Sequence, residues 1–178
     1  MYIGDTITTG SETRLKDHFL RFAAYNQWAN ARLYSAASIL SEAALSENVG
    51  AFFNSLFGTL SHILVADRIW MNRLTGEGPS HADLEDRPFA SFADLRAERE
   101  KMDRRIVEFV GSLDSTDFPA DLHYKDMSGQ PHTVPCILVL AHFFNHQTHH
   151  RGQAHHMLTK AGLDAPSLDF MHFVLDGD

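Results

Sequence analysis

Half of the chain's twelve histidines lie between residues 141 and 160. Apolar residues recur in this stretch at helical spacing, which predicts one long amphipathic helix. His146 and His150 are four residues apart, so they project from adjacent turns on the flank nearest the apolar face. Two histidines of zinc-binding helices have the same spacing. The pattern therefore indicates a divalent-metal site, which needs a further ligand from elsewhere in the chain.

The same histidines also have less specific interpretations. A pair at this spacing arises easily in a histidine-rich helix, and clustered histidines can form a solvated face or bind nickel or zinc loosely. The pairs 142 with 146 and 146 with 149 have equally permissible helical separations. The stretch by itself leaves the choice among its histidines open, and these are His142, His146, His149, His150, His155 and His156.

A segment that is apolar on most sides, residues 51–74, predicts a helix at the centre of the fold. It contains His62 and Asp67, whose burial is costly without partners. His62 is either a satisfied core histidine or the missing ligand, because an adjacent helix of a bundle is where that ligand would come from. Asp67 cannot share the face of His62. We expect it to be a buried acceptor for a neighbouring helix or a partner of a different histidine.

Two further apolar stripes predict helices over residues 11–40 and 91–113, and the helix with the clustered histidines starts near Pro135. Asn26 interrupts the first stripe, so its buried amide should make an inter-helix hydrogen bond or support a site. Ser91 and Asp94 have the spacing of a capping box. The charged residues of the same helix predict a solvated face, formed by Glu98, Glu100, Lys101, Asp103, Arg104 and Arg105.

The connections between these helices are expected to be of two kinds. Residues 41–50 are small and polar, which indicates a loop between helices. Between residues 114 and 135 a short, irregular hairpin is plausible, with His123 and His132 facing solvent and Pro131 weakening its second arm. The apolar tail after residue 167 should pack back on the helices. These elements predict an all-α fold, a four-helix bundle with a short irregular hairpin or loop between its third and fourth helices.

Length and composition restrict the possible classes of protein. With 178 residues, 44% of them hydrophobic, residues 1–178 should form a single domain. The formal charge of −8 and the absence of any basic run argue against nucleic-acid binding. No signal-peptide pattern or membrane-length apolar run is present, so we expect a cytoplasmic protein without a membrane partner. The single cysteine, Cys136, excludes an internal disulfide and has no assigned role.

Four segments together resemble the DinB/YfiT-like metalloproteins. The stretch NHQTHHRGQ (residues 145–153) looks like that family's signature, in which a histidine, three residues and a second histidine precede Arg-Gly-Gln. The stretch LSHILVADRIW (residues 60–70) is similar to the family's second-helix motif. YNQWAN (residues 25–30) and LDF (residues 168–170) resemble its first-helix pattern and its tail. The resemblance covers almost the whole chain.

The resemblance implies that His62, His146 and His150 bind one divalent metal, and that the chain is a homodimer. The orientation on the helix favours the same pair, because only side chains beside the apolar seam can meet a ligand from the buried second helix. Three neutral imidazoles suit zinc, nickel, iron or copper. Three protein ligands leave a position open for water or substrate, as in catalytic zinc sites.

Two classes of function follow from such a site. The first is a metal-dependent enzyme acting on a small-molecule substrate. Relatives use a low-molecular-weight thiol in transfer or isomerisation, and hydrolysis is possible with the same ligands. The second is a non-catalytic metal-binding or stress-response protein. The exchangeable position favours the enzyme, although no general base stands out in the sequence.

Overall fold

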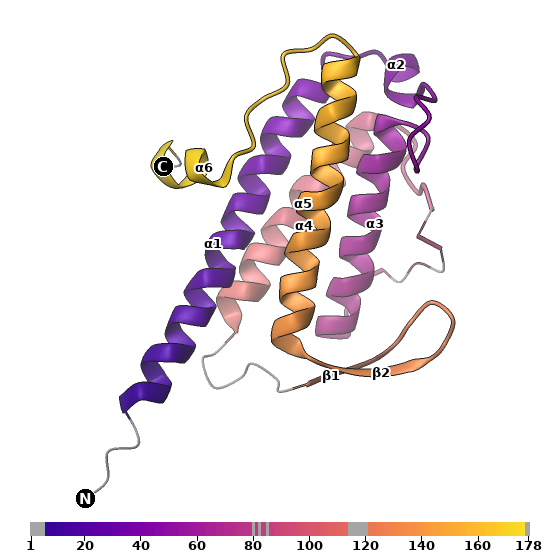
Figure 1. The fold of residues 1–178 in the computed structure, drawn as a ribbon. Helices are drawn as coiled ribbons and strands as arrows, with labels where there is room; N and C mark the ends of the chain where they lie inside the picture. Colours follow the sequence, from indigo (N-terminus) through magenta and orange to yellow (C-terminus); the bar gives the residue numbers. More distant parts are fainter. Residues whose placement is uncertain (1–5, 80, 82, 85, 114–120, 177–178) are drawn as a thin grey trace, which may run out of the picture.

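Four long helices make up most of the protein. The computed structural model describes residues 6–79, 81, 83–84, 86–113 and 121–176. Helices α1 and α3 each pack against both α4 and α5, so the four lie side by side and enclose the core (Figure 1). Among the described residues, no helix combines the length and the apolarity that a membrane span requires. The long helices are α1 (Thr6–Ala37), α3 (Leu56–Thr75), α4 (Phe92–Ser112) and α5 (Cys136–Lys160).

The fold is mostly helical, but it is not purely α as predicted. Strands β1 (Asp121–Lys125) and β2 (Pro131–Pro135) form an antiparallel hairpin before α5, with Asp121 opposite Pro135 and Lys125 opposite Pro131. Pro131 and Pro135 do not disturb the hairpin, because they are the first and last residues of β2. At the ends of an edge strand, the missing N–H group of a proline removes no hydrogen bond from the middle of the sheet. His123 and His132 are exposed, as predicted.

The start of the second long helix differs from the prediction in a way that shapes the site. Asn54 has a positive φ of 66° and Ser55 caps the helix by accepting a hydrogen bond from the Gly58 N–H, so α3 begins at Leu56 and not at Ala51. Residues 51–54 form a tight turn with a bridge between Ala51 and Asn54. This turn removes two phenylalanines from the predicted helix.

Other boundaries were also predicted incorrectly. Helix α1 begins at Thr6, so Ser11 lies inside it and does not precede it. The expected loop over residues 41–50 contains a short helix, α2 (Glu42–Ser46), whose N-cap Ser41 accepts a hydrogen bond from the Ala44 N–H. The Ser91 cap is confirmed, because its hydroxyl accepts from the Asp94 N–H and donates to the Asp94 carboxylate.

The predicted solvated face of α4 is confirmed in part: Glu100, Lys101 and Arg104 are exposed, but Asp103 belongs to a buried ion-pair network. Asp103 is only 3% exposed and Arg99 only 1%. The Arg99 guanidinium donates to Asp67 on α3, and its Nη2 atom lies 2.9 Å from Oδ1 of Asp103. Burial raises the pKa of Asp67 to about 6, and the neighbouring Arg99 guanidinium opposes this effect. Asp67 is thus the predicted buried acceptor for a neighbouring helix.

Helices α1 and α5 extend this network. Asn26 and Asn30 of α1 both donate to Oδ1 of Asp103, at 3.2 and 2.9 Å. The Asn26 side-chain oxygen accepts from Arg151 on α5, which is also buried. Asn26 therefore makes inter-helix hydrogen bonds, the first of the two predicted roles. The network joins all four long helices and includes Arg151, the residue that directly follows His150.

The C-terminal tail packs on α1, as predicted. Phe170, the first residue of α6 (Phe170–Asp176), stacks on Phe22 with ring centroids 5.1 Å apart. The Tyr25 hydroxyl donates to the Leu168 carbonyl at 2.7 Å. The tail therefore closes one side of the helical layer, away from the hairpin (Figure 1).

Candidate metal centre

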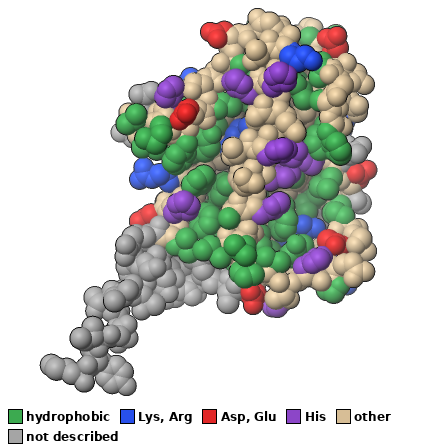
Figure 2. Space-filling view, viewed as in Figure 1, with side chains coloured by type: hydrophobic (Ala, Val, Ile, Leu, Met, Phe, Trp, Pro, Cys, Tyr) green, Lys and Arg blue, Asp and Glu red, His purple; other side chains and the backbone are tan. Residues whose placement is uncertain are grey.

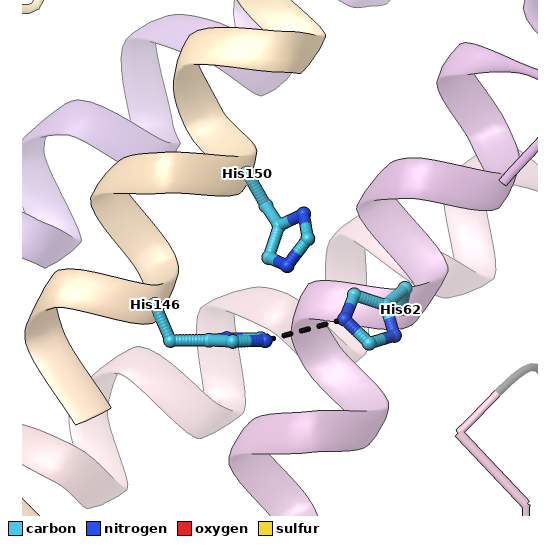
Figure 3. Close-up of side chains that lie close together, drawn as sticks. All are labelled: His62, His146 and His150. Carbon is cyan, nitrogen blue, oxygen red and sulfur yellow. Dashed lines mark hydrogen bonds between the residues drawn. The ribbon is translucent and has the colours of Figure 1, made fainter. Parts of the chain in front are cut away.

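Three histidines from two helices converge at one point. His62 comes from α3, and His146 and His150 come from successive turns of α5 (Figure 3). One nitrogen of each imidazole lies within 4.8 Å of the others. The Nε2 atoms of His62 and His146 are 3.3 Å apart, and the ring centroids of His146 and His150 are 4.4 Å apart. Within the described ranges, this is the one cluster of three possible metal-ligating side chains.

Hydrogen bonds orient two of these rings. The Nδ1 atom of His62 lies 3.0 Å from the Leu84 carbonyl oxygen, which can only accept, so Nδ1 carries the hydrogen. The Nδ1 atom of His150 likewise lies 2.8 Å from Oε1 of Gln153. Both rings therefore direct an unprotonated Nε2 atom away from these acceptors. Such outer hydrogen bonds typically set the tautomer and orientation of metal-binding histidines.

The turn before α3 covers one side of the cluster. The Phe53 ring stacks on the His62 imidazole, with centroids 3.8 Å apart and an angle of 17° between the planes. Arg87 donates to the Phe53 carbonyl at 3.2 Å. A Cβ atom on Gly58 would overlap that same carbonyl oxygen, so the turn can approach α3 only because residue 58 is glycine. Backbone packing thus holds Phe53 against His62.

Burial keeps the three imidazoles neutral. It lowers the pKa of His146 to about 3, and the neighbouring imidazoles of His150 and His62 add to this effect. Burial also lowers the pKa of His62, which the Leu84 carbonyl partly opposes. The pKa of His150 is lowered by burial as well, against the opposing effect of Gln153. Neutral imidazole is the form that binds a metal ion.

The donor set and its spacing are compatible with a divalent metal. Nitrogen ligands lie ~2.0–2.1 Å from zinc, so two of them on a tetrahedral ion are about 3.3–3.4 Å apart. The 3.3 Å between Nε2 of His62 and Nε2 of His146 matches this separation. Because Nδ1 of His62 carries its hydrogen, Nε2 of His146 is the donor between these two rings. Three histidines leave further coordination positions open.

The remaining histidines of α5 lie outside the cluster. His142, His149 and His156 are exposed. Nε2 of His155 donates to the Pro166 carbonyl, 3.0 Å away, so this nitrogen carries a hydrogen. Figure 2 shows histidine side chains spread along the face over α5, with hydrophobic side chains between them. His146 and His150 are therefore the two α5 histidines that lie beside His62. This is the pair that orientation on the helix favoured.

A cavity of about 580 Å³ adjoins the cluster. His62 and His150 form part of its wall, so the open side of the cluster faces a space large enough for a small molecule. The cavity is assembled from five parts of the chain: the 51–54 turn, α3, the segment after α3, the tip of the hairpin, and α5. It is lined by Phe52, Phe53, His62, Asp83, Leu84, Met127, His149, His150 and Gln153.

Several residues of this site were not predicted from the sequence. Gln153 follows His150 by three positions on the same helix, and this spacing could have identified it as a hydrogen-bond partner. No local sequence pattern indicates the roles of Phe53 and of the Leu84 carbonyl, because both roles depend on contacts between separate segments of the chain. The same holds for Met127, which lies at the hairpin tip.

Comparison with known proteins agrees with this architecture. Residues 13–175 match the model of the DinB family. The chain is 23% identical over 165 residues to Protein DinB of Bacillus subtilis (strain 168), covering 88% of this chain and 93% of that protein. A crystal structure of a DinB-like protein from Bacillus cereus ATCC 10987 has a similar fold, with a TM-score of 0.59 and 23% identity over 78% of this chain and 89% of that one. The chain belongs to the DinB family.

Proposed function

We propose that His62, His146 and His150 bind one divalent transition metal through their Nε2 atoms. The observation that carries this proposal is the 3.3 Å spacing of Nε2 atoms on two different helices, within a cluster of three neutral imidazoles. Leu84 and Gln153 would hold two of the ligands in the correct tautomer. The donor set suits zinc, nickel, iron or copper, and availability would decide among them.

We further propose that the site belongs to a metal-dependent enzyme that uses a low-molecular-weight thiol in transfer or isomerisation. A bound divalent metal would favour the thiolate form of the thiol at neutral pH. The protein would provide a binding space for the thiol and its partner substrate in the 580 Å³ cavity beside His62 and His150. The Phe53 ring would exclude water from one face of His62. The open position beside a cavity is the feature that supports an enzyme over a structural metal site.

The experiment that tests this proposal combines metal loading with a panel of thiols. Purified protein is stripped with a chelator, reloaded with zinc, nickel or iron, and assayed with each thiol and small electrophilic substrates. We expect turnover that requires both the metal and a thiol and that disappears on chelation. Metal-dependent turnover without any thiol would indicate a hydrolase instead. Stoichiometric metal without turnover or thiol binding would indicate a non-catalytic metal protein.

We also propose that residues 1–178 form one DinB-like four-helix-bundle domain and that this domain is a homodimer. The support for the domain is the packing of α1 and α3 against both α4 and α5. For the dimer, it is the number of large apolar side chains left exposed, among them Ile39, Leu138 and Leu175. Sedimentation should give the dimer mass. A monomer mass at all concentrations would contradict the dimer.

A further inference from the structure

The cavity beside the three histidines has apolar walls that no part of the described fold covers. Phe52 is 80% exposed, and Leu84 and Met127 are also exposed. These three residues come from three separate segments, yet all of them line the same cavity. Soluble proteins rarely gather exposed apolar side chains around one concave site unless a ligand covers them.

The walls are held in place by contacts of their own. Phe52 packs edge-on against Phe53, with ring centroids 4.8 Å apart. The tip that carries Met127 is a tight turn in which the Asp126 carboxylate accepts from the Ser128 and Gln130 N–H groups. The Leu84 carbonyl accepts a hydrogen bond from Nδ1 of His62. The cavity is therefore largely formed before a ligand arrives, which reduces the entropy lost on binding.

The charge of the lining also restricts the ligand. The nine described residues around the cavity include one acid, Asp83, and no lysine or arginine. Away from the proposed metal, a phosphate or carboxylate group in the cavity would thus have no cationic side chain to pair with, and its desolvation would be uncompensated. An uncharged apolar group instead removes the exposed surface of Phe52 and Met127 from water.

We propose that this cavity binds the apolar body of a small, uncharged ligand, whose metal-binding atom reaches the histidine cluster. The inference rests on the proposed metal site, and it adds the chemical class of the ligand. Phe52, Leu84 and Met127 are its specificity-determining residues. The volume of about 580 Å³ lies within the range of ~300–1,000 Å³ that is usual for small-molecule pockets.

The test compares three thiols that share the metal-binding atom and differ in the remainder. Zinc-loaded protein is titrated calorimetrically with phenylmethanethiol, 2-mercaptoethanol and 4-(mercaptomethyl)benzoate, and zinc content is measured before and after. We expect phenylmethanethiol to bind about tenfold tighter than 2-mercaptoethanol, because its ring is buried in the cavity. The carboxylate of 4-(mercaptomethyl)benzoate lies across the ring from the thiol and cannot reach the same zinc ion. This compound should therefore bind more weakly than phenylmethanethiol, since its carboxylate lacks a cationic partner in the cavity.

Substitutions locate the preference. Phe52→Ala and Met127→Gln should each leave the zinc content unchanged. Each should reduce the preference for phenylmethanethiol over 2-mercaptoethanol several-fold. Ile39→Ala is the matched control, because Ile39 is 74% exposed but does not line the cavity. Equal affinities for the two neutral thiols, or binding of 4-(mercaptomethyl)benzoate at least as tight as that of phenylmethanethiol, would overturn the inference and leave the metal site intact.

Failure of the metal site can be distinguished from failure of this inference. If the protein retains no zinc, the proposed function fails, and the cavity is then tested on metal-free protein with benzyl alcohol by NMR. Shifts at Met127 that disappear in Phe52→Ala would support the apolar subsite, and their absence in the wild type would overturn it. A change from dimer to monomer in Phe52→Ala but not in Ile39→Ala would also overturn it, because the patch would then be a contact between two copies.

Discussion

Oε1 of Gln153 lies 2.8 Å from Nδ1 of His150, and the other end of the same amide, Nε2, lies 3.2 Å from Nε2 of His149. The amide can therefore accept from His150 while it donates to His149. This pair of bonds leaves Nε2 of His150 unprotonated and directed toward the cluster.

We predict that Gln153→Ala weakens metal binding by about 10–100-fold without abolishing it, because His150 loses the acceptor that sets its tautomer. The change is measured by competition with a chelator of known affinity. Gln153→Glu retains an acceptor at this position and should restore most of the affinity. Unchanged metal affinity in Gln153→Ala would show that this hydrogen bond does not orient the ligand.

The second prediction concerns the identity of the ligands. His62→Ala, His146→Ala and His150→Ala should each greatly weaken metal binding, because each would remove one of three ligands. The matched controls His142→Ala, His149→Ala, His155→Ala and His156→Ala should retain it. Metal content of the purified variants, determined by elemental analysis, is the measurement. Near-normal metal content in His150→Ala with loss in His149→Ala would mean that the ligand register on α5 is wrong by one residue, and with it the face of the helix that lines the site.

Metal removal should destabilise the fold, because the proposed site joins α3 to α5 and is poorly formed in the unfolded chain. At a free metal concentration 100 times the dissociation constant, linkage adds about 2.7 kcal/mol to the free energy of unfolding. For a chain of this size that corresponds to a rise in melting temperature of roughly 5–10 °C. Calorimetry before and after chelation tests this. An unchanged melting temperature, with metal loss verified, would contradict the prediction.

Acidification should destabilise the metal-free protein through the same histidines. Burial lowers the pKa values of His62, His146 and His150, whereas in the unfolded chain histidine titrates near its ordinary value of about 6.5. Below that value the unfolded chain binds more protons than the folded one, so the free energy of unfolding falls as the pH decreases. For His146 the window extends from about pH 6.5 to about pH 3.

Denaturant unfolding between pH 7 and pH 4 measures this dependence. In His146→Gln the free energy of unfolding should fall less steeply with decreasing pH than in the wild type. The reason is that the imidazole with the lowered pKa has been removed. His156→Gln, at an exposed position of the same helix, should follow the wild type. Identical pH profiles for all three proteins would assign acid destabilisation to other groups.

The fifth prediction separates buried from exposed charges on α4. Asp103→Ala removes one of the two carboxylates beside Arg99 and the acceptor that the side-chain amides of Asn26 and Asn30 share, so it should cost about 3–5 kcal/mol of stability. Glu100→Ala removes only the exposed pair with Arg96 and should cost less than about 1 kcal/mol. Chemical denaturation measures both. If Asp103→Ala lowered the free energy of unfolding by no more than Glu100→Ala does, the buried network would not have the structural role inferred here.

Much of the candidate site could be predicted from the sequence because the relevant information is local. The spacing of His146 and His150 places them on one face of a helix, and the apolar surroundings of His62 predict a buried helix beside it. The cap at Ser91 and the hairpin before α5 also depend on neighbouring residues. Family membership rested on motifs of the same local kind, such as residues 145–153.

Other features were decided only by tertiary structure. The charge pattern of α4 predicted that Asp103 would share a solvated face with Glu100 and Lys101. Instead α4 packs against both α1 and α3, which encloses Asp103 together with Arg99, and these two pair with each other, with Asp67 and with two asparagines. Likewise Phe53 stacks on His62 because a turn over residues 51–54 replaces the first residues of the expected helix, and Gly58 lets this turn approach α3. Periodicity describes which residues share a face of one helix. Which segment covers that face, and therefore which polar groups are desolvated and paired, depends on contacts between residues far apart in the chain.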